Sequence, residues 1–128
     1  MGKIYSASEA ELEVLEKLWD LEDGIKQSRL LALFEADGKE WKRQTLNTFL
    51  SRLEEKGLVK RENRIVRPTG SREEYHYQQI LHAIDTMYDG QLSKLVAAFI
   101  KMNNVNESET TEILRLLNNY KNTITTKE

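Results

Sequence analysis

WKRQTLNTFLSRLEEKG, residues 41–57, runs directly into LVKRENRIVRP, residues 58–68. The first of these segments carries apolar residues at the spacing of one helical face, namely Leu46, Phe49, Leu50 and Leu53. This spacing predicts an amphipathic helix that begins near Lys42 and buries that face. Gly57 supplies a left-handed cap, and LVKR and RIVRP then form two short β-prone runs. We therefore expect a helix followed by a small β-hairpin.

The same stretch concentrates positive charge. From Lys42 to Arg67 there are eight Lys or Arg and three Glu, a local net charge of +5, although the chain of 128 residues has a net charge of -2. Four basic residues crowd the short hairpin, where their mutual repulsion favours an anionic partner. Taken alone, the polar side of the helix is as typical of a face that only contacts solvent as of a face that binds nucleic acid. Together with the basic hairpin it predicts binding to nucleic acid.

Two further helices are predicted before this stretch. Ser8 and Glu11 have the spacing of a capping box, and the apolar residues that follow predict a helix over residues 8–20. LEDGI interrupts this apolar pattern. KQSRLLALFEA restores it and predicts a second helix, which Asp37 and Gly38 end. Three helices followed by a two-stranded hairpin is the order of a winged helix-turn-helix domain. In that domain the third helix enters the major groove and the wing touches phosphate.

The outward residues of the third helix and of the hairpin are the candidate DNA-binding residues. Thr45, Asn47 and Thr48 carry short polar groups that can reach base edges. Basic residues at the two ends of the helix and in the wing can neutralise phosphates. The predicted DNA-binding set is Lys42, Arg43, Gln44, Thr45, Asn47, Thr48, Arg52, Lys60, Arg61, Arg64 and Arg67.

The chain after the hairpin predicts a helical second domain. Ser71 and Glu74 again have capping-box spacing, before a long amphipathic helix that ends near Gly90, and two further helices with apolar stripes follow. Such helices, with no sheet to cover, more readily pair with the same helices of another chain. The predicted dimer interface is Ile84, Tyr88, Leu92, Leu95, Val96, Phe99, Ile113, Leu116, Leu117 and Tyr120.

The fold expected from these patterns is mainly α with a small β-hairpin. A winged helix-turn-helix DNA-binding domain is expected over residues 1–70, and a helical dimerisation domain over residues 71–128. Trp19 and Trp41 each lie at the edge of an apolar helical pattern. Stacking platforms for bases are one interpretation of such residues, and core aromatics are the commoner one.

Composition and motifs argue against several other classes of protein. The chain has no Cys, so it holds neither a disulfide nor a thiolate metal site, which suits a reducing cytosol. There is no Gly-rich phosphate loop or nucleophile elbow, and His76 and His82 fall on different helix faces, so we expect no enzyme, metal or cofactor. We also find no signal-peptide core and no run of about 18 apolar residues. A cytoplasmic protein is expected.

Several segments together resemble one family of regulators. SEAELEVLEKLW is similar to that family's first helix, and W with KRQTLNTFLSRLEEKGLV is similar to its recognition helix and wing entry. The likeness extends over nearly the whole chain through P with SREEY, YDGQLSKLVAAFI and NESETTEILRLLNNY. The family is that of the BlaI/MecI repressors of penicillinase and methicillin-resistance operons. The resemblance implies a homodimer that binds a dyad-symmetric operator, blocks transcription and leaves DNA when a membrane sensor system causes its cleavage.

The resemblance also bears on single residues. The family contacts DNA at positions that correspond to Lys42, Thr45, Thr48 and Arg52. The wing is shorter here than is usual in the family, and Gln44 stands where a Lys is common. Ala98 and Phe99 align with the Asn-Phe pair that inducing proteolysis cuts in the antibiotic-resistance members, so induction by that cleavage is not predicted. The Cys cluster of the copper-responsive branch is absent, which argues against copper sensing.

Two other functions are compatible with the same residues. Some winged-helix domains bind protein, and a basic wing suits an acidic partner. A non-specific architectural DNA binder would use the same surface without sequence preference. The basic stretch, the apolar stripes and the resemblance together favour a dimeric, sequence-specific repressor, with an upstream sensor or protease as a further partner.

Overall fold

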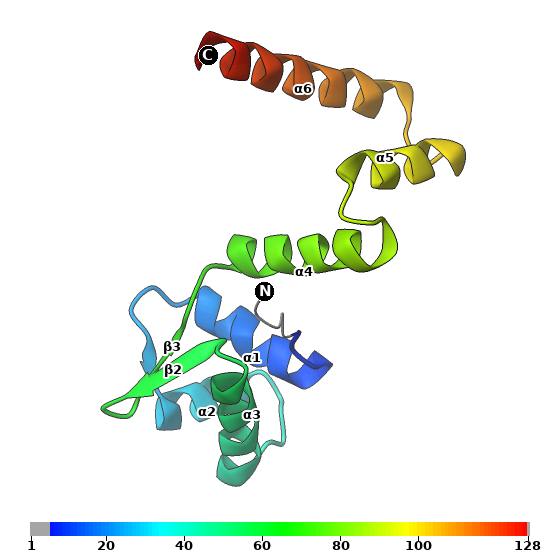
Figure 1. The fold of residues 1–128 in the computed structure, drawn as a ribbon. Helices are drawn as coiled ribbons and strands as arrows, with labels where there is room; N and C mark the ends of the chain where they lie inside the picture. Colours follow the sequence, from blue (N-terminus) through cyan, green and yellow to red (C-terminus); the bar gives the residue numbers. More distant parts are fainter. Residues whose placement is uncertain (1–5, 128) are drawn as a thin grey trace. The chain divides into compact units, whose positions relative to one another are not determined.

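The computed structural model describes residues 6–127. Its elements are α1 (Glu9–Trp19), β1 (Ile25–Lys26), α2 (Gln27–Ala36), α3 (Arg43–Glu55), β2 (Val59–Glu62), β3 (Ile65–Pro68), α4 (Arg72–Met87), α5 (Leu92–Lys101) and α6 (Glu107–Lys127). The prediction of a mainly helical chain with a winged helix is confirmed (Figure 1). The chain divides into two compact units, the first ending at His82 and the second beginning at Ala83, so that the boundary falls within α4.

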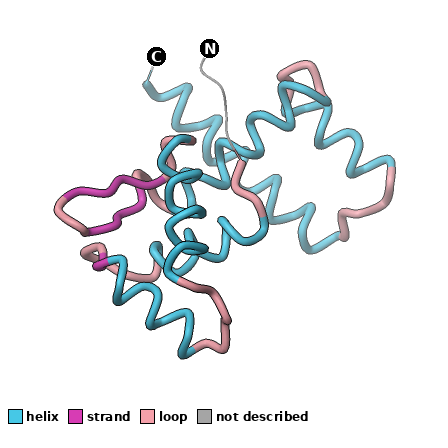
Figure 2. Tube along the Cα trace, turned by 90° about the horizontal axis from the view of Figure 1, so that it is seen from below, coloured by secondary structure: helices cyan, strands magenta, loops and turns pink. Residues whose placement is uncertain are grey.

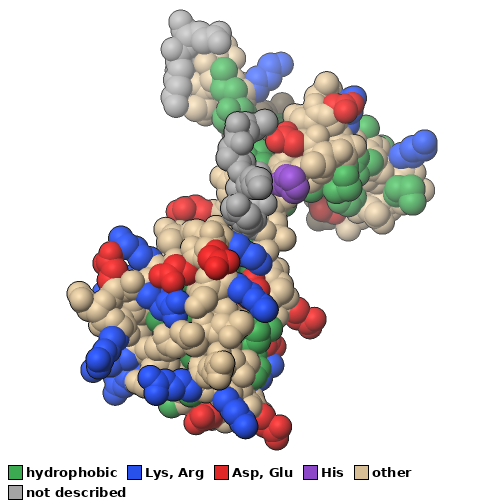
Figure 3. Space-filling view, turned by 60° about the horizontal axis from the view of Figure 1, so that its bottom comes forward, with side chains coloured by type: hydrophobic (Ala, Val, Ile, Leu, Met, Phe, Trp, Pro, Cys, Tyr) green, Lys and Arg blue, Asp and Glu red, His purple; other side chains and the backbone are tan. Residues whose placement is uncertain are grey.

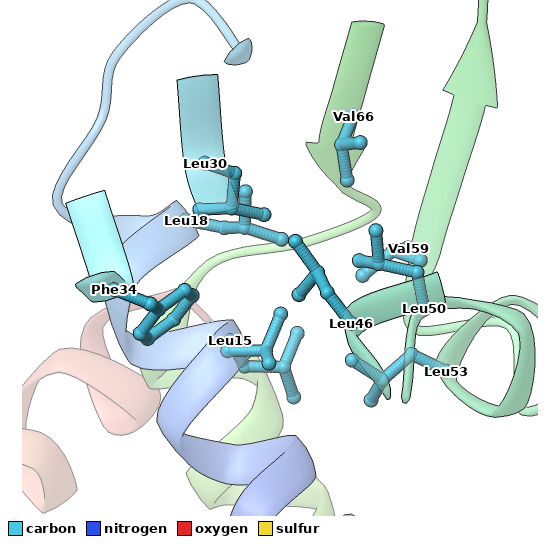
Figure 4. Close-up of a cluster of buried hydrophobic side chains, with 10 residues drawn as sticks. Leu15, Leu18, Leu30, Phe34, Leu46, Leu50, Leu53, Val59 and Val66 are labelled. Atoms are coloured by element: carbon cyan, nitrogen blue, oxygen red, sulfur yellow. The ribbon is translucent and has the colours of Figure 1, made fainter. Parts of the chain in front are cut away.

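One buried apolar cluster forms the core of the first unit. Its members come from the first three helices and from both strands of the hairpin, and in Figure 4 their side chains point toward one another. They are Val14, Leu15, Leu18, Leu30, Phe34, Leu46, Leu50, Leu53, Val59 and Val66. Each such side chain contributes roughly 1.5–3 kcal/mol by leaving water. The stripe predicted for α3 lies inside this core, with Phe49 packed partly buried against it.

The sheet has one strand more than the predicted hairpin. β1 pairs antiparallel with β3, Ile25 opposite Val66, so the strand order is β1-β3-β2. Figure 2 shows the two hairpin strands side by side, in magenta. The approach of β1 requires Gly24, where φ is +78° and where an added Cβ would lie 2.7 Å from Cγ of Arg67. A strand of two residues leaves no alternation in the sequence, and LEDGI therefore indicated only a break.

The two tryptophans pack against the core, which confirms their interpretation as core aromatics. The ring of Trp41 lies 4.7 Å from that of Phe34, centroid to centroid. Trp19 lies 5.6 Å from the ring of Tyr75 in α4, and its indole Nε1 donates a hydrogen bond to the carbonyl of Gly70 at 3.0 Å. Trp19 thereby joins α1 to the segment that leaves the wing.

In the second unit most large apolar side chains lie at the surface. Ile84 is buried, whereas Met87, Leu92, Val96, Phe99, Ile100, Met102, Leu114, Leu116, Leu117, Tyr120 and Ile124 are exposed. Within residues 6–127, no helix combines the length and the apolar character that crossing a membrane needs.

A partly buried ion pair joins the beginning of α1 to the end of α3. Ser8 and Glu11 form the predicted capping box: the Glu11 amide donates to Ser8 Oγ at 3.2 Å, and the Ser8 amide donates to Glu11 Oε1 at 3.3 Å. The Glu11 side chain is only 3% exposed, and Lys56 Nζ donates to its Oε1 at 2.6 Å. Burial is the largest influence on the Glu11 pKa and raises it, but the bonds and charge of Lys56 and Ser8 together outweigh burial and lower the pKa below 4.5.

We expect Glu11→Gln to reduce the free energy of unfolding at neutral pH by about 1–2 kcal/mol, because a charge-assisted hydrogen bond is weakened. A carboxyl whose pKa is lowered by folding stabilises the protein above its unfolded pKa and loses this effect as pH falls through its folded pKa. The difference in free energy of unfolding between wild type and variant should therefore shrink as pH falls, and urea unfolding at neutral and acid pH measures it.

Glu13→Gln is the matched control, because Glu13 pairs with Lys39 at the surface and its side chain is 43% exposed. This change should reduce the free energy of unfolding by less than about 0.5 kcal/mol. Equal losses in the two variants would contradict a special role for the Glu11 pair.

Candidate DNA-binding surface

The buried stripe of α3 decides which of its side chains face solvent. Leu46, Leu50 and Leu53 are fully buried. The candidate residues on the rest of the helix are accessible: Lys42, Arg43, Gln44, Asn47 and Arg52 are exposed, and Thr45 and Thr48 are half-buried. Figure 3 shows Lys and Arg side chains gathered over one face of the first unit, with a few carboxylates between them.

The wing ends in a tight turn built from two left-handed residues. Glu62 pairs with Ile65, so the loop between the strands is Asn63 and Arg64, with φ of 51° and 67°. Positive φ at both central residues is the mark of a type I′ turn, whose twist matches that of the strands it joins. The basic side chain of Arg64 is thereby presented at the tip of the wing, where it is exposed.

Strand alternation sends the wing's basic residues to two different sides. Lys60 and Arg67 are partners in the ladder and both are exposed. Lys60 Nζ lies 3.0 Å from Glu62 Oε1 in a solvated pair. Among the residues that the structure describes, the side chains of Arg64 and Arg67 make no hydrogen bond or ion pair. These two guanidinium groups are available to an external anion.

Arg61 behaves differently, since its side chain is only 21% exposed. It is paired with the fully buried Val66, and partners in a ladder point to the same face of the sheet. From there the guanidinium reaches three residues of α3 and the first residue of α2. Its acceptors are Glu54 Oε1 (from Nε at 3.3 Å and Nη2 at 2.9 Å), Ser51 Oγ (2.9 Å), Asn47 Oδ1 (2.8 Å) and Gln27 Oε1 (3.3 Å).

This network was not anticipated from the sequence, and three of its members, Gln27, Ser51 and Glu54, were not among the candidate residues. A signal was nonetheless present. Asn47, Ser51 and Glu54 follow one another at the spacing of one helical face. Period-two alternation in LVKR also places Arg61 on the same side of the strand as the buried Val59.

Within α3, one candidate reading group is already engaged. The hydroxyl of Thr48 donates to the carbonyl of Gln44 at 3.0 Å. Its hydrogen is therefore used inside the helix, and the methyl group and the oxygen lone pairs remain for other contacts.

The candidate interface residues of the second unit differ in exposure. Ile84 is buried; Tyr88, Leu95 and Ile113 are half-buried; and Leu92, Val96, Phe99, Leu116, Leu117 and Tyr120 are exposed. In α5 the residues Leu92, Val96 and Phe99 recur at helical spacing and share a face. Among the described residues, no group of three His, Cys, Asp or Glu side chains is placed to hold a metal ion.

Three helices followed by a basic hairpin, with polar and basic side chains exposed on the third helix, define a winged helix-turn-helix regulator. The family model of the penicillinase repressor matches residues 7–119, and the chain belongs to this family. This confirms the resemblance found in the sequence. Proteins of the family are transcriptional regulators and not enzymes.

Two relatives indicate how far the similarity extends. The methicillin resistance regulatory protein MecI of Staphylococcus aureus (strain N315) is 27% identical over 121 residues, covering 91% of this chain and 97% of the relative. The penicillinase repressor of Bacillus licheniformis is 28% identical over 126 residues, covering 95% and 97%. The similarity therefore spans both units of the chain.

We expect Arg64→Gly to stabilise the first unit by roughly 0.5–1 kcal/mol. The left-handed conformation costs an L side chain about 1–2 kcal/mol, of which the entropy that Gly loses on folding cancels a part. Arg67→Gly is the matched control, since it removes the same charge from a strand, where Gly weakens pairing, and it should destabilise. Thermal unfolding of the two variants measures the difference, and an Arg64→Gly protein no more stable than wild type would contradict the turn assignment.

Proposed function

We propose that this chain is a sequence-specific repressor that binds a dyad-symmetric operator as a homodimer. The observation that supports it most directly is the outer face of α3, which is polar and basic and lies beside a wing with exposed Lys60, Arg64 and Arg67. Membership of the penicillinase repressor family supports the same function.

In the proposed complex, α3 lies in the major groove. Thr45, Asn47 and Thr48 read base edges there, and Lys42, Arg43 and Arg52 neutralise phosphates on either side of the helix. Gln44 lies at the start of the same exposed face. The wing adds phosphate contacts through Lys60, Arg64 and Arg67, while Arg61 lies behind them against α3. Such a complex placed over a promoter blocks access of polymerase.

A second copy of the chain is the proposed partner of the apolar surface of residues 83–127. Phe99 is 47% exposed, Leu92 59% and Tyr120 65%. Removing apolar area of this kind from water contributes about 25 cal/mol per Å², and the freedom lost on association opposes this contribution. A two-fold dimer would set two recognition helices about 34–36 Å apart, the spacing of successive major grooves. Residues 1–70 are then the DNA-binding domain and residues 71–128 the dimerisation domain.

The step that ends repression is proposed to depend on an upstream sensor or protease. Ala98, half-buried in α5, stands before Phe99 where the resemblance leads one to expect Asn. Cleavage at that bond is therefore not part of the proposal. The signal and the cellular compartment, expected to be the cytoplasm, belong to the same hypothesis.

The DNA-binding proposal is tested by selecting duplexes from a randomised library and titrating the bound duplex against salt. We expect enrichment of an inverted repeat, and an affinity whose logarithm falls by about 0.9 per log unit of salt for each phosphate neutralised. Arg52→Ala should lower this slope by about 0.9 and weaken binding to selected and unselected DNA alike.

Arg115→Ala is the control for the DNA-binding test, because it removes the same charge from α6, where Arg115 pairs with Glu112. This variant should leave the slope unchanged. Binding without enrichment would indicate an architectural DNA binder. Affinity that stays flat with salt would contradict DNA binding and favour a protein-binding winged helix.

The dimer proposal predicts that Phe99→Asp yields monomers, because association would bury an unpaired carboxylate. The folded monomer should tolerate the change, since Phe99 is half exposed. Ala97→Asp places the same charge on the opposite side of α5, on a residue that is also exposed, and should leave the dimer intact. Sedimentation equilibrium distinguishes the two states. A Phe99→Asp protein that still sediments as a dimer would show that Phe99 lies outside the interface.

A further inference from the structure

The guanidinium of Arg61 has its hydrogen-bonding capacity filled within the protein. A guanidinium carries five N–H groups and no acceptor. Arg61 donates five hydrogen bonds, two of them to Glu54 and one each to Ser51, Asn47 and Gln27. Glu54 also balances its charge, with Oε1 at 2.9 Å from Nη2. No N–H group of Arg61 is left for a phosphate, although the residue belongs to a basic wing.

This contact fixes the orientation of the Asn47 side-chain amide. Because a guanidinium can only donate, the amide atom that faces it at 2.8 Å is the carbonyl oxygen Oδ1. The amide of Gln27 donates to the same oxygen at 3.4 Å. Both lone pairs of Oδ1 are therefore occupied from inside the protein. Within residues 6–127 the NH2 group of Asn47 has no hydrogen-bond partner, and it lies on an exposed residue of α3.

We propose that Arg61 is a positioning residue that makes Asn47 a donor-only reader, and that Asn47 consequently selects guanine. An Asn that reads adenine uses both of its amide atoms, the oxygen accepting from N6 and the nitrogen donating to N7. Asn47 has only its NH2 group to offer. Guanine presents two acceptors in the major groove, N7 and O6, whereas the N6 amino group of adenine is a donor that opposes another donor. This inference rests on the proposed binding of α3 in the major groove.

The role differs from that of the other wing arginines in a measurable way. A residue that neutralises phosphate contributes to the salt dependence of binding to any DNA. A residue that orients a reading group contributes to the difference between one DNA sequence and another. Arg64, at the exposed tip of the wing, is the matched example of the first kind.

The experiment uses the full chain and a library of randomised duplexes, with wild type, Asn47→Ala, Arg61→Met, the double variant and Arg64→Met. Each protein is put through selection, and affinity is then measured for the wild-type-selected duplex and for a scrambled duplex of the same composition, over a range of salt. Circular dichroism and thermal unfolding report whether each variant is folded.

We expect one position in each half-site to be guanine for wild type and to lose its preference in Asn47→Ala. Arg61→Met should lose preference at that same position, reduce the ratio of selected to scrambled affinity by roughly tenfold, and leave the salt slope unchanged. The double variant should lose no more specificity than Asn47→Ala alone, because Arg61 acts through Asn47. Arg64→Met should lower the slope by about 0.9 and leave the ratio unchanged.

Arg61→Lys serves as a second variant that keeps the positive charge and does not depend on whether Arg61→Met folds. An ammonium is a point charge and lacks the planar fork that holds Glu54 and Asn47 at once, so the guanine preference should still be lost. If Arg61→Lys keeps wild-type selectivity, a positive charge at this position is enough for guanine preference and the positioning role is wrong.

Three further results would overturn the inference. They are adenine at the position read by Asn47, additive losses in the double variant, and a salt slope that falls in Arg61→Met as it does in Arg64→Met. In each of these cases wild type still enriches a sequence, so the proposed function survives. A wild-type protein that enriches no sequence would overturn both the proposed function and this inference.

Discussion

The burial of one leucine stripe in α3 is the constraint on which the rest of the first unit depends. Leu46, Leu50 and Leu53 are fully enclosed by α1, α2 and the hairpin, and this fixes the rotation of α3 about its own axis. Hydrophobic burial has no direction of its own, but a helix that must bury one side has only one side left to expose. The exposure of Asn47 and Arg52 is therefore a consequence of packing that neither residue takes part in.

Polar contacts supply the direction that the apolar core lacks. Glu11 and Lys56 join the first turn of α1 to the end of α3, and Arg61 joins the wing to the middle of α3. The first contact joins residues 45 positions apart in the sequence and the second joins residues 14 positions apart, and in both a carboxylate balances the cation. Removing one partner of such a pair costs more than the pair itself contributes, since the other is left partly buried and unpaired. The contacts of Arg61 with α3 therefore help to hold the wing and that helix in one relative orientation.

Much of this fold follows from local patterns. The capping box at Ser8, the stripe of α3 and the cap at Gly57, where φ is +75°, are short-range features, and each is where the sequence predicted it. β1 was missed because two residues show no period and because their partners in β3 lie far along the chain. The inward turn of Arg61 was missed for a related reason: it follows from strand register, which composition and charge do not reveal. The exposed candidate residues on α3 needed only the helical period.

In the proposed complex, the charges of surface side chains and the orientation of the base-reading side chains have different roles. Lysines and arginines at the surface give affinity that is insensitive to sequence, and their number sets the salt dependence. Base reading requires a few groups held in one orientation, and a free amide can present either of its two ends. By turning inward, Arg61 gives up a phosphate contact and removes one of the two orientations open to Asn47. In the proposed complex, one arginine used in this way adds selectivity that another exposed charge in this short wing would not supply.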